Sequence, residues 1–295
     1  MRAKGDILQI WGNFVRHLRA GSVSYVLLAF VLIPVNYGLE ALKWQRLTAP
    51  FVQLSFGDAL RGVLLGAGFG VLTPARLGDY GGRLYAIPRR FYPRVVWALT
   101  YGSAWQTAIL LGMGTWGMYQ LWDVLPVNVT TRSGFLLLLW LIHFLFVGIL
   151  VTHGLWLGFV KRKFGKRLRI ARDAFVVYDL RQMVQIAVLS LLRVGAFSLQ
   201  YYLLNVFFGL DAGAVTDWAI VSVIFLFQSI VLVPNMLGLL MKSQIGLWLW
   251  GEFGGNVISV ISGTFFLWLF NTVVPALAGL ALAGRFFKDK LEDHV

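Results

Sequence analysis

The sequence predicts an all-α, polytopic integral membrane protein, and three observations support this. The chain has 295 residues, of which 58% are hydrophobic and only 13% are charged. Soluble domains carry about a quarter charged residues and under half apolar ones. Apolar runs of about 20 residues, the length of a membrane-spanning helix, recur along the chain. Two further apolar segments are interrupted at prolines. The composition excludes an ordinary soluble enzyme, a disordered protein and a fibrous repeat.

Five full spans and two interrupted segments are expected. The full spans fall at 22–42, 95–121, 134–157, 182–208 and 257–284. The interrupted segments are 55–87, with a break at Pro74, and 217–250, with a break at Pro234. Backbone N–H and C=O groups that lose their helical hydrogen bonds at such a break cannot face lipid. We therefore interpret both segments as re-entrant hairpins, and the alternative is a pair of long helices with proline kinks.

The order of these elements predicts two repeats, each made of a span, a hairpin and a further span. Five segments follow: an amphipathic N-terminal segment 1–21, a first transmembrane repeat 22–158, a basic loop 159–181, a second transmembrane repeat 182–284 and a charged tail 285–295. Proline interruptions at corresponding positions of two halves are typical of transporters with a binding site near the membrane midplane.

The cations lie mainly between the apolar segments. Lys and Arg number 26 against 13 Asp and Glu, a formal net charge of +13. Seven cations fall within 160–175, and the positive-inside rule places this loop in the cytoplasm, beneath the plasma (inner) membrane. When the spans are counted in both directions from this loop, the two hairpins enter the membrane from opposite faces, as inverted repeats require. The same count places the C-terminus in the cytoplasm. Such a charge pattern favours contact with anionic lipid headgroups rather than nucleic acid.

The first hairpin carries charges deep within an apolar region. Arg76, Asp79 and Arg83 follow Pro74 at spacings of three and four, which places them on one face of a helix. Charges inside a membrane indicate a substrate site by default. Arginine suits a phosphate, and an aspartate can hold the guanidinium fork in place. The pattern predicts a site for an anionic group, and a structural ion-pair network is the alternative.

Other polar residues extend this candidate site. Arg193 and Gln200 are seven residues apart in one span and share a helix face. Lys242 follows the second break, where it either meets a phosphate or snorkels to the interface. Gln106 is a candidate for an interior polar contact. Four residues define the two helix breaks: Pro74, Gly78, Pro234 and Gly238.

Glycines recur every fourth residue, at Gly62, Gly66 and Gly70, which predicts close helix packing. No nucleotide-binding glycine motif and no pair of histidines at metal-ligand spacing occurs, and cysteine is absent. We therefore expect no metal, no cofactor and no enzymatic activity.

Two motifs in the first half resemble a known family. Leu42–Trp44 before the hairpin and Pro74–Asp79 within it are similar to motifs of the flippase-like family related to the transmembrane region of lysylphosphatidylglycerol synthase. In the second half Ser190–Arg193 and Trp268–Pro275 are also similar. The resemblance runs from about residue 38 to residue 283.

The resemblance implies inverted repeats with re-entrant helices and the movement of a lipid with an anionic or aminoacylated headgroup between leaflets. Arg76 and Asp79 would be the headgroup residues. The soluble aminoacyl-transferase domain of the synthase has no counterpart here, so lipid synthesis is not expected. The alternatives are a non-transporting lipid-binding scaffold for a partner enzyme and a membrane-embedded transferase with Asp79 as its base. Expected partners are membrane lipids and either a second copy or a partner membrane enzyme.

Overall fold

The computed structural model describes residues 23–73, 77–124, 132–164, 174–230 and 235–292, together with Gly12 and Val15. These residues form helices and connecting turns without any strand, which confirms the all-α class. Four helices are long and apolar enough to cross a membrane: Val23–Thr48, Arg132–Val151, Leu180–Phe207 and Val257–Gly284. They correspond to four of the predicted spans. The remaining one, 95–121, lies in a 29-residue helix, Tyr92–Gln120, that is not among the four.

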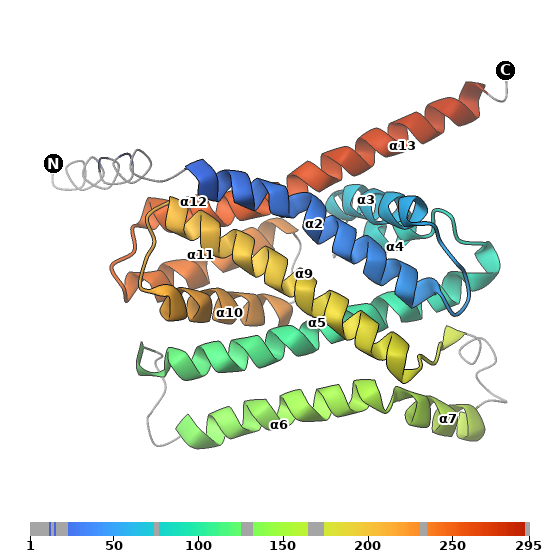
Figure 1. Ribbon diagram of the computed structural model, residues 1–295, viewed down its shortest axis with the longest axis horizontal. Coiled ribbons are helices and arrows are strands. Elements are labelled where there is room, and N and C mark those ends of the chain that lie inside the picture. Colours follow the sequence, from blue (N-terminus) through green and yellow to red (C-terminus); the bar gives the residue numbers. More distant parts are fainter. Residues whose placement is uncertain are drawn as a thin grey trace. The chain divides into compact units, whose positions relative to one another are not determined.

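The helices follow the predicted order twice, as a long helix, a broken pair and a further long helix (Figure 1). The first set is α2 (Val23–Thr48), α3 (Phe56–Leu72), α4 (Leu77–Arg83) and α5 (Tyr92–Gln120). Two connecting helices are α6 (Arg132–Val151) and α7 (His153–Phe164). The second set is α9 (Leu180–Phe207), α10 (Ala214–Ile230), α11 (Asn235–Gly251), α12 (Val257–Trp268), a π-helical turn (Leu269–Val273) and α13 (Val274–Glu292).

Backbone contacts divide the chain into two compact units. Unit 1 consists of residues 1–35, 110–142 and 195–271, and unit 2 consists of residues 36–109, 143–194 and 272–295. In unit 1, α11 packs against both α10 and α12. In unit 2, α3 packs against both α4 and α13. Each unit draws on both halves of the sequence, so the units differ in their boundaries from the predicted repeats.

The chain turns back on itself between α3 and α4, and glycines permit the close approach. A side chain at Gly78 would collide with the Phe69 carbonyl, and one at Gly82 would collide with the backbone of Gly66. A Cβ at Gly62 would lie 3.7 Å from the Gly82 carbonyl oxygen. Because Phe69 meets Gly78 while Gly66 meets Gly82, the helices are antiparallel. The segment is therefore a helical hairpin rather than one kinked helix, and the predicted glycine stripe is a packing surface.

The opposite side of α3 packs equally closely on α13. A Cβ at Gly68 would lie 3.1 Å from the Leu280 nitrogen and 3.2 Å from the Ala276 carbonyl oxygen. A side chain at Gly279 would collide with the Leu64 carbonyl. Helix α3 is thus held between two neighbours through its backbone, with little room for side chains on either side.

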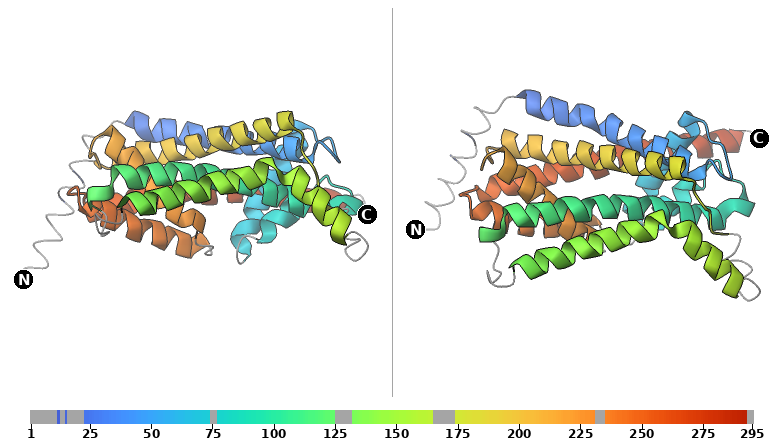
Figure 2. Two further views of the ribbon diagram at one scale, coloured as in Figure 1. Left: turned by 90° about the horizontal axis from the view of Figure 1, so that it is seen from below. Right: turned by 60° about the horizontal axis from the view of Figure 1, so that its bottom comes forward.

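The predicted span 134–157 corresponds to the candidate span Arg132–Val151, but the helix ends earlier than predicted and a second helix, α7, begins at His153 (Figure 2). The division falls at Thr152, and the buried His153 stabilises it. Its Nε2 accepts a hydrogen bond from the Tyr178 backbone nitrogen at 3.0 Å. Its Nδ1 therefore carries the proton and donates to the Leu150 carbonyl oxygen at 2.9 Å. A contact 25 residues away along the chain sets this break, which local sequence does not encode.

Tyr178 anchors the stretch that precedes α9. Its side chain is buried, its hydroxyl donates to the Leu47 carbonyl oxygen at 3.0 Å, and its ring stacks on Tyr101 at 4.7 Å. Burial raises the pKa of the Tyr178 hydroxyl. Two residues earlier, the Val176 carbonyl oxygen accepts from Trp97 Nε1 at 2.8 Å. This stretch is therefore fixed to α2 and α5.

Parts of three predicted segments lie outside the described residues. The N-terminal segment 1–21 does so apart from Gly12 and Val15. The basic loop is helical as far as Phe164 and lies outside the description from 165 to 173. The charged tail continues α13 to Glu292.

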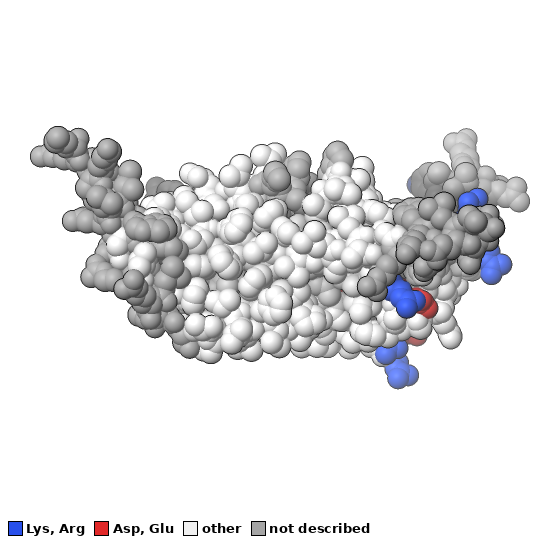
Figure 3. All heavy atoms as spheres, turned by 90° about the horizontal axis from the view of Figure 1, so that it is seen from above, with Lys and Arg blue, Asp and Glu red and all other residues white. Residues whose placement is uncertain are grey.

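Many large apolar side chains are exposed while several charged ones are buried, which is unusual for a soluble protein. Large exposed apolar side chains on α2 and α6 include Leu27, Phe30, Val31, Leu141, Phe144 and Leu145. Buried charged side chains include Glu40, Lys43 and Arg83. In the space-filling view, the visible charged side chains gather at one end of the face, and the middle carries none (Figure 3). This distribution suits lipid around the helices.

We expect Gly82→Ala to destabilise the hairpin by about 1–3 kcal/mol, because the added methyl group meets the α3 backbone. The matched control is Gly81→Ala, since a Cβ there meets nothing within 4 Å. The control should be neutral or slightly stabilising, because alanine favours helix. Thermal unfolding of the purified protein, followed by tryptophan fluorescence, measures both. Equal midpoints for the two variants would contradict the close packing of α3 on α4.

Candidate functional site

A buried carboxylate on α2 is the centre of a charge cluster in unit 2. Glu40 is 5% exposed. Its Oε1 accepts from Arg83 Nη2 at 2.7 Å. Its Oε2 lies 2.7 Å from Lys43 Nζ and 3.0 Å from Arg193 Nη1. One carboxylate therefore meets three cations from three helices, and we call these residues together with Asp79 the Glu40 cluster.

Local structure positions two of the pairs. Glu40 and Lys43 are three apart on α2, and Asp79 and Arg83 are four apart on α4, so each pair shares a helix face. Asp79 Oδ1 accepts from Arg83 Nε at 3.1 Å. Thr73 Oγ1 accepts from the Gly78 backbone nitrogen at 2.6 Å, which fixes the start of α4.

The α3–α4 packing brings Arg83 to α2. A Cβ at Gly62 would lie 3.7 Å from Arg83 Cα and 3.9 Å from Trp44 Nε1. The Arg83 guanidinium lies over the Trp44 ring, with Cζ 5.4 Å from the ring centroid. Trp44 is fully buried. The guanidinium therefore has a cation–π contact on one side and carboxylates at its edge.

Two amide side chains accept hydrogen bonds from the cations of the cluster. Gln106 of α5 accepts from Arg193 Nη1 at 2.6 Å and from Lys43 Nζ at 3.4 Å. Asn36 of α2 accepts from Arg193 Nε at 3.1 Å. The predicted interior contact of Gln106 is confirmed. Helices α2, α4, α5 and α9 all contribute to one connected network.

The cluster contains one more positive charge than negative. Three cations, Lys43, Arg83 and Arg193, face two carboxylates, Glu40 and Asp79. Arg83 Nη1 is buried without a hydrogen-bond partner among the described residues. The Arg193 side chain is 22% exposed and that of Asp79 is 25% exposed, whereas Glu40, Lys43 and Arg83 are almost inaccessible. The arrangement offers an anion an unmatched charge, an unused donor and an accessible edge.

The structure brings together three of the residues predicted from the sequence, Asp79, Arg83 and Arg193. Arg76, Pro74 and Pro234 lie outside the described residues. Gly78 packs on α3 as a helix contact, and Gly238 is buried on α11.

Gln200 and Lys242 belong to unit 1, whereas the network consists of residues of unit 2. Gln200 donates to the Ala29 carbonyl oxygen at 2.9 Å. Lys242 Nζ lies 5.9 Å from the centroid of the Phe225 ring.

Sequence reasoning missed the central residue, Glu40, and misplaced Lys43. The predicted span ends at residue 42, but α2 continues to Thr48 and Lys43 is 3% exposed. The available signal was the spacing of Glu40 and Lys43, which pairs opposite charges at the end of an apolar helix.

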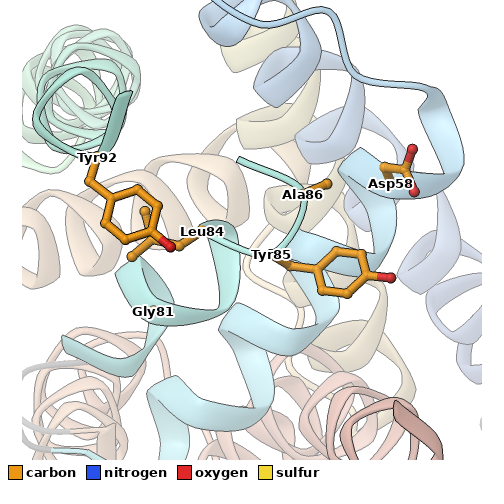
Figure 4. Close-up of a pocket in the computed structure, with 6 residues that line it drawn as sticks. All are labelled: Asp58, Gly81, Leu84, Tyr85, Ala86 and Tyr92. Carbon is orange, nitrogen blue, oxygen red and sulfur yellow. The ribbon is translucent and has the colours of Figure 1, made fainter. Parts of the chain in front are cut away.

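An open pocket lies beside the end of α4 (Figure 4). Its volume is about 570 Å³. The lining residues are Asp58, Gly81, Leu84, Tyr85, Ala86 and Tyr92. Gly81 and Leu84 flank Gly82 and Arg83, which are buried. A polar and aromatic depression thus adjoins, along the chain, the helix end that carries the buried arginine.

No group of three or more histidine, aspartate or glutamate side chains within the described ranges could hold a metal ion. Comparison with protein-family models finds no match, and comparison with curated proteins finds none either. The resemblance to the flippase-like family therefore depends on the quoted motifs alone, and it stays a prediction.

We expect Glu40→Gln to destabilise the protein by about 3–5 kcal/mol, because it leaves three cations, two of them buried, with a single carboxylate. Asp123→Asn is the matched control. Asp123 is 91% exposed and pairs with Arg132 at 3.4 Å, so its loss should cost at most about 1 kcal/mol. Thermal unfolding and size-exclusion profiles measure both. A Glu40→Gln protein as stable as the control would show that the cluster does not depend on this carboxylate.

Proposed function

We propose that the protein moves a lipid with an anionic headgroup between the leaflets of the membrane. The observation that supports this best is the unmatched positive charge of the Glu40 cluster, buried in a chain whose outer surface is apolar. Ion pairs that serve only structure usually balance, because an unpaired buried charge costs several kcal/mol. An excess cation with an accessible edge suits a phosphate that enters and leaves.

In this proposal the two arginines have different roles. Arg193 lies at the accessible edge and meets the phosphate first. Arg83 offers Nη1 as the buried donor, while Asp79 and Glu40 hold its other nitrogens in place. The lipid tails stay in the bilayer throughout. Arg76, which precedes α4, is a further headgroup residue by its resemblance to the family motif.

The proposed membrane arrangement keeps five spans and two re-entrant hairpins, in an inner membrane with a cytoplasmic C-terminus. Helix lengths support re-entry. A hydrocarbon core of about 30 Å needs about 20 helical residues. Helix α4 has 7 residues, about 10 Å at 1.5 Å per residue, and α10 and α11 have 17 each. Each of these three helices is shorter than a typical membrane-spanning helix.

The lipid-binding scaffold remains the second candidate, since a headgroup site alone does not require movement. The two candidates differ in whether a bound lipid crosses the bilayer. Lipids that co-purify with the protein, compared with those of an Arg76→Ala, Asp79→Ala double variant, identify the headgroup. Enrichment of one anionic lipid that disappears in the variant is expected.

The first prediction concerns movement in liposomes that contain tail-labelled phosphatidylglycerol. With the protein present, a membrane-impermeant quencher should reach nearly all the label instead of the outer-leaflet half. Arg193→Gln should slow the movement of the labelled lipid between leaflets about tenfold or more, because it removes a charge-assisted hydrogen bond worth roughly 1.5–3 kcal/mol. Arg181→Gln, an exposed cation on the same helix, should match the wild type. Lipid enrichment without any movement would favour the scaffold, and equal rates for both variants would remove Arg193 from the pathway.

The second prediction concerns the opposite orientation of the hairpins. The chain has no cysteine, so single cysteines can be introduced directly. Gly57→Cys and Val215→Cys place exposed thiols near the starts of α3 and α10. A membrane-impermeant maleimide should label them from opposite sides. Labelling from one side would exclude inverted hairpins.

A further inference from the structure

The excess charge of the Glu40 cluster needs an explanation when no headgroup is bound. In that state three cations face two carboxylates, and three of these five side chains, those of Glu40, Lys43 and Arg83, are almost fully buried. An uncompensated charge in an apolar interior is commonly removed by a change of protonation. One group of the cluster should therefore titrate when the anion leaves.

The chemistry of the five side chains leaves one candidate. Arg83 and Arg193 do not lose their protons in proteins. Protonation of Glu40 or Asp79 would increase the excess positive charge instead of removing it. Lys43 is the remaining group, and a buried lysine loses its proton readily.

The surroundings of Lys43 suit this role. From its own helix it faces Glu40, with Nζ 2.7 Å from Oε2. From α5 it faces the neutral amide of Gln106 at 3.4 Å. Through Glu40 it shares a carboxylate with Arg83 of α4, itself paired with Asp79, and with Arg193 of α9. Lys43 therefore competes with two permanently charged arginines for one carboxylate, and Gln106 can accept a hydrogen bond from either the ammonium group or the neutral amine.

We infer that Lys43 is the proton-carrying residue of the site, and that binding of one phosphodiester monoanion is coupled to uptake of one proton by Lys43 Nζ. This inference depends on the proposed headgroup site. The empty cluster, with neutral Lys43, carries no net charge, and the occupied cluster, with Lys43 protonated, carries none either. A headgroup and a proton then cross together without net charge, so a pH difference across the membrane drives the movement.

Binding of dihexanoyl phosphatidylglycerol to the purified protein, measured by calorimetry across a range of pH, tests the coupling. Its phosphodiester keeps one negative charge throughout. Above the pH at which Lys43 of the empty protein loses its proton, the Kd of the wild type should rise about tenfold per pH unit, the slope for one coupled proton. In a weak buffer that reports protons, binding should take up about one proton per lipid in the same range.

Two variants distinguish the effect of the positive charge of Lys43 on lipid binding from the effect of its titration. Lys43→Arg keeps the charge but cannot release the proton, so binding should persist and lose its pH dependence. Lys43→Met leaves two arginines opposite two carboxylates, so no excess positive charge remains to attract the phosphate. Binding should therefore be weaker at every pH and, as in Lys43→Arg, independent of pH. Size-exclusion profiles show whether each variant folds. If Lys43→Arg does not fold, the comparison of wild type with Lys43→Met is sufficient for the test.

The failure of this inference differs from the failure of the proposed function. If wild type and both variants bind the lipid with the same pH dependence, Lys43 is not the coupled group, while the headgroup site stands. If the wild type binds no lipid at any pH, the proposed function fails. Dimethyl phosphate serves as the probe without tails. Binding of dimethyl phosphate as tightly as the lipid, with the same slope, would support Lys43 and overturn the lipid assignment.

Discussion

The shared carboxylate of Glu40 is the interaction on which unit 2 depends. It contacts Arg83 of α4, Lys43 of its own helix and Arg193 of α9. Without it, three cations, two of them buried, would have Asp79 as their one anionic partner in the cluster. Because unpaired buried charges cost several kcal/mol each, the places where α4 and α9 meet α2 are set by this one side chain.

The glycine contacts of α3 make that interaction possible. Arg83 reaches Glu40 because Gly82 lies directly on the α3 backbone at Gly66, and a methyl group there would move α4 away. The buried Trp44 ring then lies beneath the guanidinium, with its centroid 5.4 Å from Cζ. Small residues and charges therefore act together. The glycines bring α4 close to α3, and the ion pairs fix the position of α4 against α2. A change in either affects the other, so glycine and charge substitutions should be coupled in double-mutant cycles.

Composition and periodicity predicted what is local. The helical class follows from apolar content, the helix breaks from prolines, and the Asp79–Arg83 pair from spacing. The centre of the site could not be predicted in this way. Hydropathy treats a charged residue as the end of a span, so the predicted span 22–42 stops just before Lys43. Its burial depends on partners such as Gln106, 63 residues away.

The two helix pairs, α3–α4 and α10–α11, hold corresponding places in the order of elements, but the units that contain them differ in what they bury. The core of unit 1 pairs neutral groups, such as the Tyr201 and Thr264 hydroxyls at 2.8 Å. Asp123 and Arg132 form an ion pair in unit 1, and it is exposed. Neutral polar groups cost far less to bury than charges. Unit 1 also buries a carboxylate, that of Asp217, which is 1% exposed and accepts a hydrogen bond from the Ala212 backbone nitrogen at 2.9 Å. In unit 2, by contrast, the buried carboxylate of Glu40 meets three cations. A single carboxylate held by a backbone N–H serves packing, whereas several charges gathered around one buried side chain are what a binding site requires.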